Sequence, residues 1–394
     1  MTQMRNLPAT IFLGTFFDTN VAVIVPRDQS DITAIWEYCS SSEFVRDVRR
    51  IDKKINVTNA TFGHVPFDAE RGRTVAKEIY PAGLPRPHTN DPAEWLFDGD
   101  PSHASCTLQV AVARLVGYRW PRQAGCEFLD SQSLQPDSLE EHGNSDGVVC
   151  LSSVSGEDPA ALRLRKLLEE AYGSDWSAER LTSLLNGAPS LEDWLKDRFF
   201  VEHCDIFQCR PFVWHVWDGR NDGFHALVNY HKLAGPSGEG KRTLEKLIYS
   251  SLGDWIGRQR AEVSAGADGA ESRLLAATHL QAELERILVG EPPYDIFVRW
   301  KPVREQPLGW EPDINDGVRL NIRPWLIARP YQPTKQDASV LRATPIKLPL
   351  GKDRGKEQAR DKVDFPWFAD GRDRTNDVHI TLEEKRKARE RNKS

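Results

Sequence analysis

The stretch RPFVWHVWDGRNDGFHALVNYHK, residues 210–232, decides the fold of this chain. Two largely apolar runs, 212–217 and 224–230, flank a polar connector, and the period of two of a β-strand places the successive side chains of each run on opposite faces. The connector at 218–223 is rich in Asp, Asn and Gly, which tolerate the positive φ angles of a chain reversal. The stretch therefore predicts a β-hairpin.

Both faces of the first predicted strand carry large side chains. Trp214 lies on one face, and His215 and Trp217 alternate on the other. A hairpin enclosed between helices explains this pattern. A second interpretation adds that Arg220 and Lys232 project from the ends of the hairpin toward a polyanion.

Length and composition limit the class of protein. A chain of 394 residues is long enough for two or three domains, and 39% hydrophobic with 28% charged residues is typical of a soluble globular protein. The net charge of −6 excludes a chain that attracts nucleic acid as a whole, so DNA binding requires a local basic face. Twelve Trp, many beside Pro, Gly or charged residues, predict aromatic side chains that hold ordered loops on a core.

Cysteine usage and hydropathy predict a cytoplasmic protein. The six Cys are scattered without the spacing of a disulfide framework, and we recognise no signal peptide, so we expect a reducing compartment. No run approaches the roughly 18 apolar residues of a membrane span. We therefore expect no membrane partner.

The order of patterns along the chain predicts an α+β fold. Residues 9–25 are expected to form strands, 32–48 a helix, and the polar, β-branched residues 52–61 a turn before a strand near 62–66. Apolar spacings of three and four then predict a series of helices, and the Pro- and Trp-rich sequence after Gly290 predicts an ordered C-terminal wrap. The expected domains are a mixed β/α domain at 1–121, a loop, linker or insertion at 122–158, a helical domain at 159–346 around the hairpin 211–231, and a charged, flexible tail at 347–394.

One tetrapeptide is similar to a catalytic motif. Glu291-Pro292-Pro293-Tyr294 can be compared with the Asn/Asp-Pro-Pro-Tyr/Phe loop of amino-group methyltransferases, in which the aromatic ring stacks on a flipped base. Glu stands at the first position, and no glycine-rich cofactor loop precedes it. We interpret the tetrapeptide as a turn that ends a helix, and we predict no catalytic or cofactor-binding residue in this chain.

A metal site is not predicted either. His203, Cys204, Cys209 and His215 match no common zinc spacing, and His215 lies in an alternating strand. Packing in the core is the simpler interpretation of the histidines in the hairpin.

A polar segment supplies the strongest candidates for DNA contacts. Lys attracts phosphates, Asn pairs with adenine edges, and Thr suits a phosphate or a thymine methyl group. The alternative is a polar turn that precedes a strand. The candidates are Lys53, Lys54, Asn56, Thr58, Asn59 and Thr61.

Nine longer segments together resemble one family. They resemble the C-terminal half of the large adenine-specific DNA methyltransferases of bacterial restriction–modification and phage-defence systems, including type IIG-like enzymes and methylases of the BREX and DISARM kind. The segments are VAVIVP (21–26), AIWEYCSSSEF (34–44), VRRIDKKINVTNATFGHVPFD (48–68), PAEWLFDGDP (92–101), LQVAVARLVGYRWP (108–121), LEDWLKDRFFVEHC (191–204), RPFVWHVWDGRNDGFHALVNYHKL (210–233), GEPPYDIFVRWKP (290–302) and GVRLNIRPW (317–325).

The resemblance implies a division of labour. In that family the N-terminal half holds the S-adenosylmethionine fold and the catalytic loop, and the strand, helix, VTNAT and strand order belongs to a target-recognition domain. This chain begins inside the recognition region, so it is similar to a detached specificity half. The expected partners are double-stranded DNA and a methyltransferase catalytic subunit or upstream half, which holds the S-adenosylmethionine.

The expected function is therefore DNA recognition and scaffolding for a site-specific adenine methyltransferase. Alternatives are an autonomous DNA-modifying enzyme with an unrecognised active site and an inactive remnant of a truncated gene. Further phosphate contacts are expected from Arg220, Lys232, Lys352 and Arg354.

Overall fold

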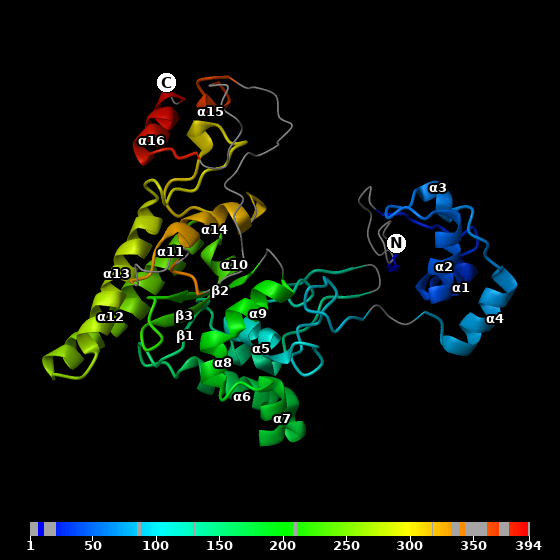
Figure 1. Ribbon diagram of the computed structural model, residues 1–394, viewed down its shortest axis with the longest axis horizontal. Coiled ribbons are helices and arrows are strands. Elements are labelled where there is room, and N and C mark those ends of the chain that lie inside the picture. The colour runs from blue at the N-terminus through cyan, green and yellow to red at the C-terminus, as the bar shows by residue number, and fades with distance from the viewer. Residues whose placement is uncertain are drawn as a thin grey trace. The chain divides into compact units, whose positions relative to one another are not determined.

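The computed structural model describes residues 7–11, 21–84, 88–128, 131–207, 211–316, 318–331, 339–342, 361–369 and 378–392. The chain divides into two compact units (Figure 1). The first comprises residues 1–98 and 120–135, and the second comprises residues 99–119 and 136–394. The boundaries expected from the sequence, at 121, 158 and 346, stay predictions.

The described part of the first unit is helical. Ser41 separates two helices because its hydroxyl caps the second one, accepting a hydrogen bond of 3.2 Å from the backbone N–H of Phe44. The elements are η1 (Gln29–Asp31), α1 (Ile32–Ser40), α2 (Ser42–Ile51), α3 (Asn59–Phe62) and α4 (Ala69–Ile79).

An apolar cluster and a tryptophan hydrogen bond hold parts of this unit together. Phe44 and Val48 on one face of α2 are buried against Val57, and the ring of Phe44 stacks on that of Phe62 with centroids 6.2 Å apart. Elsewhere in the unit, the indole N–H of Trp120 donates to the carbonyl of Pro92 over 2.8 Å. Trp120 therefore fixes a Pro-rich loop, as its sequence context predicts.

The second unit surrounds the predicted hairpin with helices. Its elements before the hairpin are α5 (Thr107–Leu115), η2 (Ser138–His142), β1 (Val148–Cys150), α6 (Ala160–Tyr172), η3 (Gly173–Asp175), α7 (Ala178–Leu185), α8 (Leu191–Asp197) and α9 (Phe199–Ile206). The hairpin and the elements after it are β2 (Val213–Trp217), β3 (His225–Asn229), α10 (Tyr230–Leu233), α11 (Glu239–Glu245), a π-helical turn η4 (Lys246–Ser251), α12 (Leu252–Ser264), α13 (Ala270–Val289), η5 (Val303–Glu305), η6 (Ile314–Asp316), α14 (Val318–Ile327), α15 (Pro366–Ala369) and α16 (Leu382–Arg391).

The sheet is small, antiparallel and buried. Its strand order is β1-β3-β2, with Trp214 opposite Val228 and Trp217 opposite His225. Helices α12 and α13 run side by side as a long pair next to it (Figure 1). The sheet and the surrounding helices confirm the predicted α+β fold and the predicted hairpin.

Aromatic rings fill the space beside the hairpin. Trp214 stacks on Tyr230 at 4.7 Å and meets the edge of Trp325 at 5.3 Å. Trp310 lies 5.5 Å from Trp325 and donates its indole N–H to the carbonyl of Leu233 over 2.8 Å. The tryptophans of the C-terminal wrap thus belong to the core of this unit.

A short extended segment covers the outer edge of β2. The backbone N–H of Trp217 donates to the carbonyl of Val340 over 2.9 Å, and the N–H of Arg342 donates to the carbonyl of His215 over 2.8 Å. The guanidinium of Arg342 then lies 4.2 Å above the Trp217 ring. Residues 339–342 therefore pair with β2 and extend the sheet beyond it.

Helix α16 docks on the wrap through cationic side chains. Lys385 is fully buried and donates to the carbonyls of Ile296 and Pro307 over 3.1 and 2.8 Å. Arg389 donates to the carbonyls of Arg304 and Gln306 over 3.0 and 2.8 Å. These two side chains hold the described end of the charged tail on the 295–307 loop.

Three local predictions were wrong. Residues 59–62, expected in a turn before a strand, form α3, because Thr58 precedes them in the extended conformation of an N-cap. The described residues at 9–11 and 22–25, expected in strands, lie in no strand either. Residues 318–327, expected in an irregular wrap, form α14 with Pro324 inside, and the burial of Ile322 and Trp325 offsets the hydrogen bond that proline removes.

Candidate functional site

The predicted DNA-contact segment is a surface loop followed by α3. The structure brings its six candidates together in one stretch of the first unit. Thr61 is buried and accepts or donates a bond of 3.1 Å to the hydroxyl of Thr58, so it supports the loop from within. The other five candidates are exposed: Lys53, Lys54, Asn56, Thr58 and Asn59.

The loop is tied to the end of α2. The guanidinium of Arg49 donates to the carbonyls of Lys54 and Ile55. The carboxylate of Asp52 accepts bonds from the backbone N–H of Lys54 over 2.9 Å and from the Thr61 hydroxyl over 3.3 Å. These bonds fix the backbone that presents the two lysines.

Positive charge is concentrated there. Arg46 and Arg50 are exposed on α2, and Arg50 pairs at 3.2 Å with Asp47 on the same helix. Within the described part of the chain, neither Lys53 nor Lys54 forms an ion pair. Both ammonium groups are therefore available to an anionic partner.

The two hairpin candidates are already paired with carboxylates. Arg220 donates to both carboxylate oxygens of Asp222, over 2.9 and 3.0 Å. Lys232 lies beyond the other end of β3 and donates to Glu239 over 3.1 Å. The last two predicted phosphate contacts, Lys352 and Arg354, lie outside the described residues.

The hairpin histidines are buried and neutral. His215 Nε2 and His225 Nδ1 are 3.0 Å apart, and burial lowers the pKa of His225 to about 4 and that of His215 well below its usual value. His203 is fully buried too, and its Nε2 accepts hydrogen bonds of 3.1 Å from the backbone N–H groups of Phe212 and Val213. All three imidazoles therefore serve the packing of the sheet.

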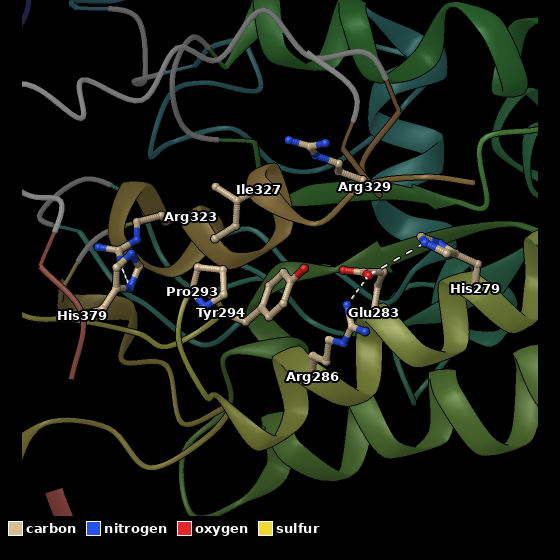
Figure 2. Close-up of a pocket in the computed structure, with 9 residues that line it drawn as sticks. All are labelled: His279, Glu283, Arg286, Pro293, Tyr294, Arg323, Ile327, Arg329 and His379. Atoms are coloured by element: carbon tan, nitrogen blue, oxygen red, sulfur yellow. Dashed lines mark hydrogen bonds and ion pairs between the residues drawn. The ribbon is translucent and has the colours of Figure 1, made fainter. Parts of the chain in front are cut away.

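A separate pocket of about 520 Å³ lies in the second unit (Figure 2). Its walls come from α13, from the Pro293-Tyr294 turn after that helix, from α14 and from His379. Gly290 ends α13 in the left-handed conformation at φ 73°, and a Cβ there would lie 2.5 Å from Gly309. The Tyr294 N–H then donates to the carbonyl of Glu291 over 2.8 Å, which confirms the predicted helix-ending turn.

Glu283 is the central group of this pocket. Its side chain is only 5% exposed, and its Oε1 accepts a hydrogen bond of 2.8 Å from Arg286. His279 Nε2 lies 3.9 Å from the same oxygen. The other oxygen, Oε2, is buried and has no hydrogen-bond partner among the described residues.

Tyr294 faces the carboxylate of Glu283. Figure 2 shows the phenol ring between Pro293 and Glu283, with its hydroxyl directed at the carboxylate. Burial raises the pKa of Tyr294, and the nearby charge of Glu283 raises it further. The hydroxyl therefore stays protonated at neutral pH.

A buried carboxylate organises one end of the pocket. Asp295 is fully buried, accepts from His379 Nδ1, and lies 3.7 Å from the guanidinium of Arg323. The Ile380 N–H donates to its second oxygen over 3.1 Å. Asp295 thus holds the side chains of Arg323 and His379 at the wall.

The sequence pattern pointed to only one wall of this pocket, the Pro293-Tyr294 turn. The Glu-Pro-Pro-Tyr tetrapeptide pointed to Tyr294, but His279, Glu283 and Arg286 recur at helical spacing and look like the solvated face of α13. The polar residues of α14 were missed because that helix was not predicted.

Two further findings concern metals and membranes. Within the described ranges, no three His, Cys, Asp or Glu side chains are grouped to hold a metal ion. No helix in those ranges is long and apolar enough to cross a membrane.

Neither a protein-family model nor a curated protein sequence matches the chain.

Proposed function

We propose that this chain is the DNA-recognition and scaffold portion of a site-specific adenine DNA methyltransferase of restriction–modification or phage defence. It would act in the cytoplasm with a separate catalytic part that binds S-adenosylmethionine. The residues 53–61 would face DNA, and the partner would flip the adenine and transfer the methyl group.

One observation carries this proposal: a braced surface loop presents two lysines that have no acidic partner among the described residues. Exposed Arg46 and Arg50 on the preceding helix add to the charge. Lys and Arg side chains that displace counterions from DNA supply most of its non-specific affinity.

The neighbouring amides suit base recognition. Asn56 and Asn59 are exposed within the same segment as Lys53 and Lys54. An asparagine amide can pair with N6 and N7 of adenine in the major groove. Under this proposal the lysines set affinity and the asparagines contribute to sequence preference.

The test is DNA binding by the double variant Lys53→Gln/Lys54→Gln, measured by fluorescence anisotropy across a salt series. The wild-type chain should bind duplex DNA at low salt. The double variant should bind more weakly on every sequence, and the slope of log affinity against log salt should shrink by about 1.8, or 0.9 for each lost phosphate contact.

Lys77→Gln is the matched control, because Lys77 is exposed on α4 in the same unit and forms no ion pair with the described residues. It should retain the wild-type slope. Absence of binding at low salt, or an equal loss in the control, would reject the proposal.

A second candidate function is an autonomous DNA-modifying enzyme. The pocket that contains Glu283 and Tyr294 favours it, since a buried carboxylate beside a tyrosine hydroxyl is found in many active sites. Calorimetry with S-adenosylmethionine separates the two candidates. Tight binding to this chain alone would support the enzyme, whereas recognition with a partner predicts none.

A further inference from the structure

The pocket at Glu283 contains polar atoms that the protein itself leaves unsatisfied. Glu283 Oε2 and His279 Nδ1 are both buried, and within the part of the chain that the structure describes neither has a hydrogen-bond partner. Buried polar atoms of this kind are rare because desolvation without a partner is costly. A ligand that donates a hydrogen bond to Glu283 Oε2 would remove that cost.

The pocket also carries a cation without an acidic partner. Arg286 pairs with Glu283, and Arg323 lies beside Asp295. Arg329 is exposed and lines the same pocket, and it forms no ion pair within the described residues. Among the described residues, three arginines therefore lie near two carboxylates at this pocket, which leaves an excess of positive charge for an anion.

The third property is an apolar wall. The ring of Tyr294 lies beside Pro293, and Ile327 lies above them in Figure 2. A tyrosine ring and a proline ring offer C–H and π faces to a saturated ring. The volume of about 520 Å³ falls within the range of sites that hold small molecules.

We propose that this pocket binds a sugar phosphate. Arg329 holds the phosphate together with the charge of Arg323, a sugar hydroxyl donates to Glu283 Oε2, and the sugar ring packs on Tyr294. Binding is non-covalent and is independent of DNA recognition by residues 53–61.

Such a group can come from a free metabolite or from the phosphorylated end of a DNA strand. Both present a phosphomonoester next to a sugar, which is the chemistry that the pocket recognises. Glucose 6-phosphate and ribose 5-phosphate are the probes for the first source. A short oligonucleotide with and without a 5′-phosphate is the probe for the second.

The experiment is calorimetry on the full chain, with inorganic phosphate and unphosphorylated glucose as reference ligands. Arg329→Gln should weaken binding of the sugar phosphate about 10-fold, as expected for the loss of a charge-assisted hydrogen bond. Arg260→Gln is the matched control, because Arg260 is an exposed arginine of α12 with no ion pair in the described ranges. It should bind as the wild type does.

Glu283→Gln tests the role of the carboxylate. It should weaken binding of the sugar phosphate without weakening binding of inorganic phosphate, since only the sugar reaches Oε2. Thermal melting of each variant shows that the fold is intact, and Arg329→Gln at an exposed position covers the case in which Glu283→Gln unfolds.

Two results would overturn the proposal. One is the absence of saturable binding of every phosphorylated probe at millimolar concentration. The other is binding that Arg329→Gln does not weaken, including oligonucleotide binding that ignores the 5′-phosphate. Phosphate-dependent binding of the oligonucleotide alone would support the proposal and identify the strand end as the source.

Discussion

The carboxylate of Asp218 occupies the space that any side chain at position 223 would need. A Cβ added to Gly223 would lie 2.2 Å from Oδ1 and 2.4 Å from Oδ2 of Asp218. The same carboxylate accepts bonds from the backbone N–H groups of Arg220 and Phe224, over 3.0 and 2.9 Å. The connector of the hairpin is thus folded around one buried side chain.

Gly223→Ala should therefore destabilise the second unit. The new methyl group displaces the carboxylate and breaks its two backbone bonds, and we expect the free energy of unfolding to fall by about 1–3 kcal/mol. Urea denaturation measures it. Gly257→Ala is the control, because no atom lies within 4 Å of its added Cβ on α12 and alanine favours helix by about 1 kcal/mol. Equal stability of the two variants would contradict the packing at Asp218.

Asp218 should make stability depend on pH. Burial raises its pKa from 3.8 to about 6, so the folded protein holds this proton more tightly than the unfolded chain. The stabilising contribution is complete below the unfolded pKa and is lost as pH rises through about 6.

The difference in unfolding free energy between wild type and Asp218→Asn isolates this effect. It should decrease from pH 4 to pH 6.5, by at most about 3 kcal/mol from 1.4 kcal/mol per pKa unit. A difference independent of pH would show that the carboxylate is ionised throughout.

His203 should have the opposite pH dependence. Burial lowers its pKa to about 3, so the unfolded chain takes up the proton first, and stability is lost as pH falls below 6.5. His203→Phe keeps an aromatic ring between α9 and β2, but it leaves the N–H groups of Phe212 and Val213 without an acceptor. We expect a loss of about 2–3 kcal/mol at pH 7.

At pH 5 the loss of unfolding free energy caused by His203→Phe should be smaller by up to about 2 kcal/mol, because the variant has no imidazole to titrate. His64→Phe, at an exposed histidine in the first unit, is the control for the substitution itself. Acid and neutral urea titrations of both variants provide the comparison.

Lys385 should control the docking of α16. Burial lowers the pKa of its ammonium group to about 8, so its contribution to stability increases as pH rises from about 8 toward 10.5. Lys385→Met leaves the carbonyls of Ile296 and Pro307 without their donor, and hydrogen exchange in α16 should accelerate by about tenfold or more. Lys387→Met, at an exposed lysine on the same helix, should exchange as the wild type does.

The sequence was informative where pattern and environment agree. Period-two spacing located β2 and β3, and apolar spacings of three and four predicted the series of helices that includes α6, α7 and α13. It failed for α14, where the Pro- and Trp-rich sequence suggested a wrap and the buried rings that pack on the helix are contributed by distant segments. It failed for α3, where polar and β-branched residues suggested a turn before a strand.

The candidate site was less predictable for a related reason. The lysines and asparagines at 53–59 were recognised by residue type, and their exposure is a property of a local loop. Glu283 comes from α13 and Arg329 from the residues that follow α14, and only the folded chain brings both to one cavity. The residue pattern also cannot show that Glu283 Oε2 lacks a hydrogen-bond partner among the described residues.

The segment 339–342 has a consequence for self-association. Open strand edges invite pairing with a second molecule, which leads to domain exchange and fibrils. Here β2 is sealed by Val340 and Arg342, while β1 has only three residues, all of them buried. Although the hairpin is the most aromatic and β-prone part of the chain, it offers no template to a neighbour, and its burial protects the folded protein from aggregation through the sheet.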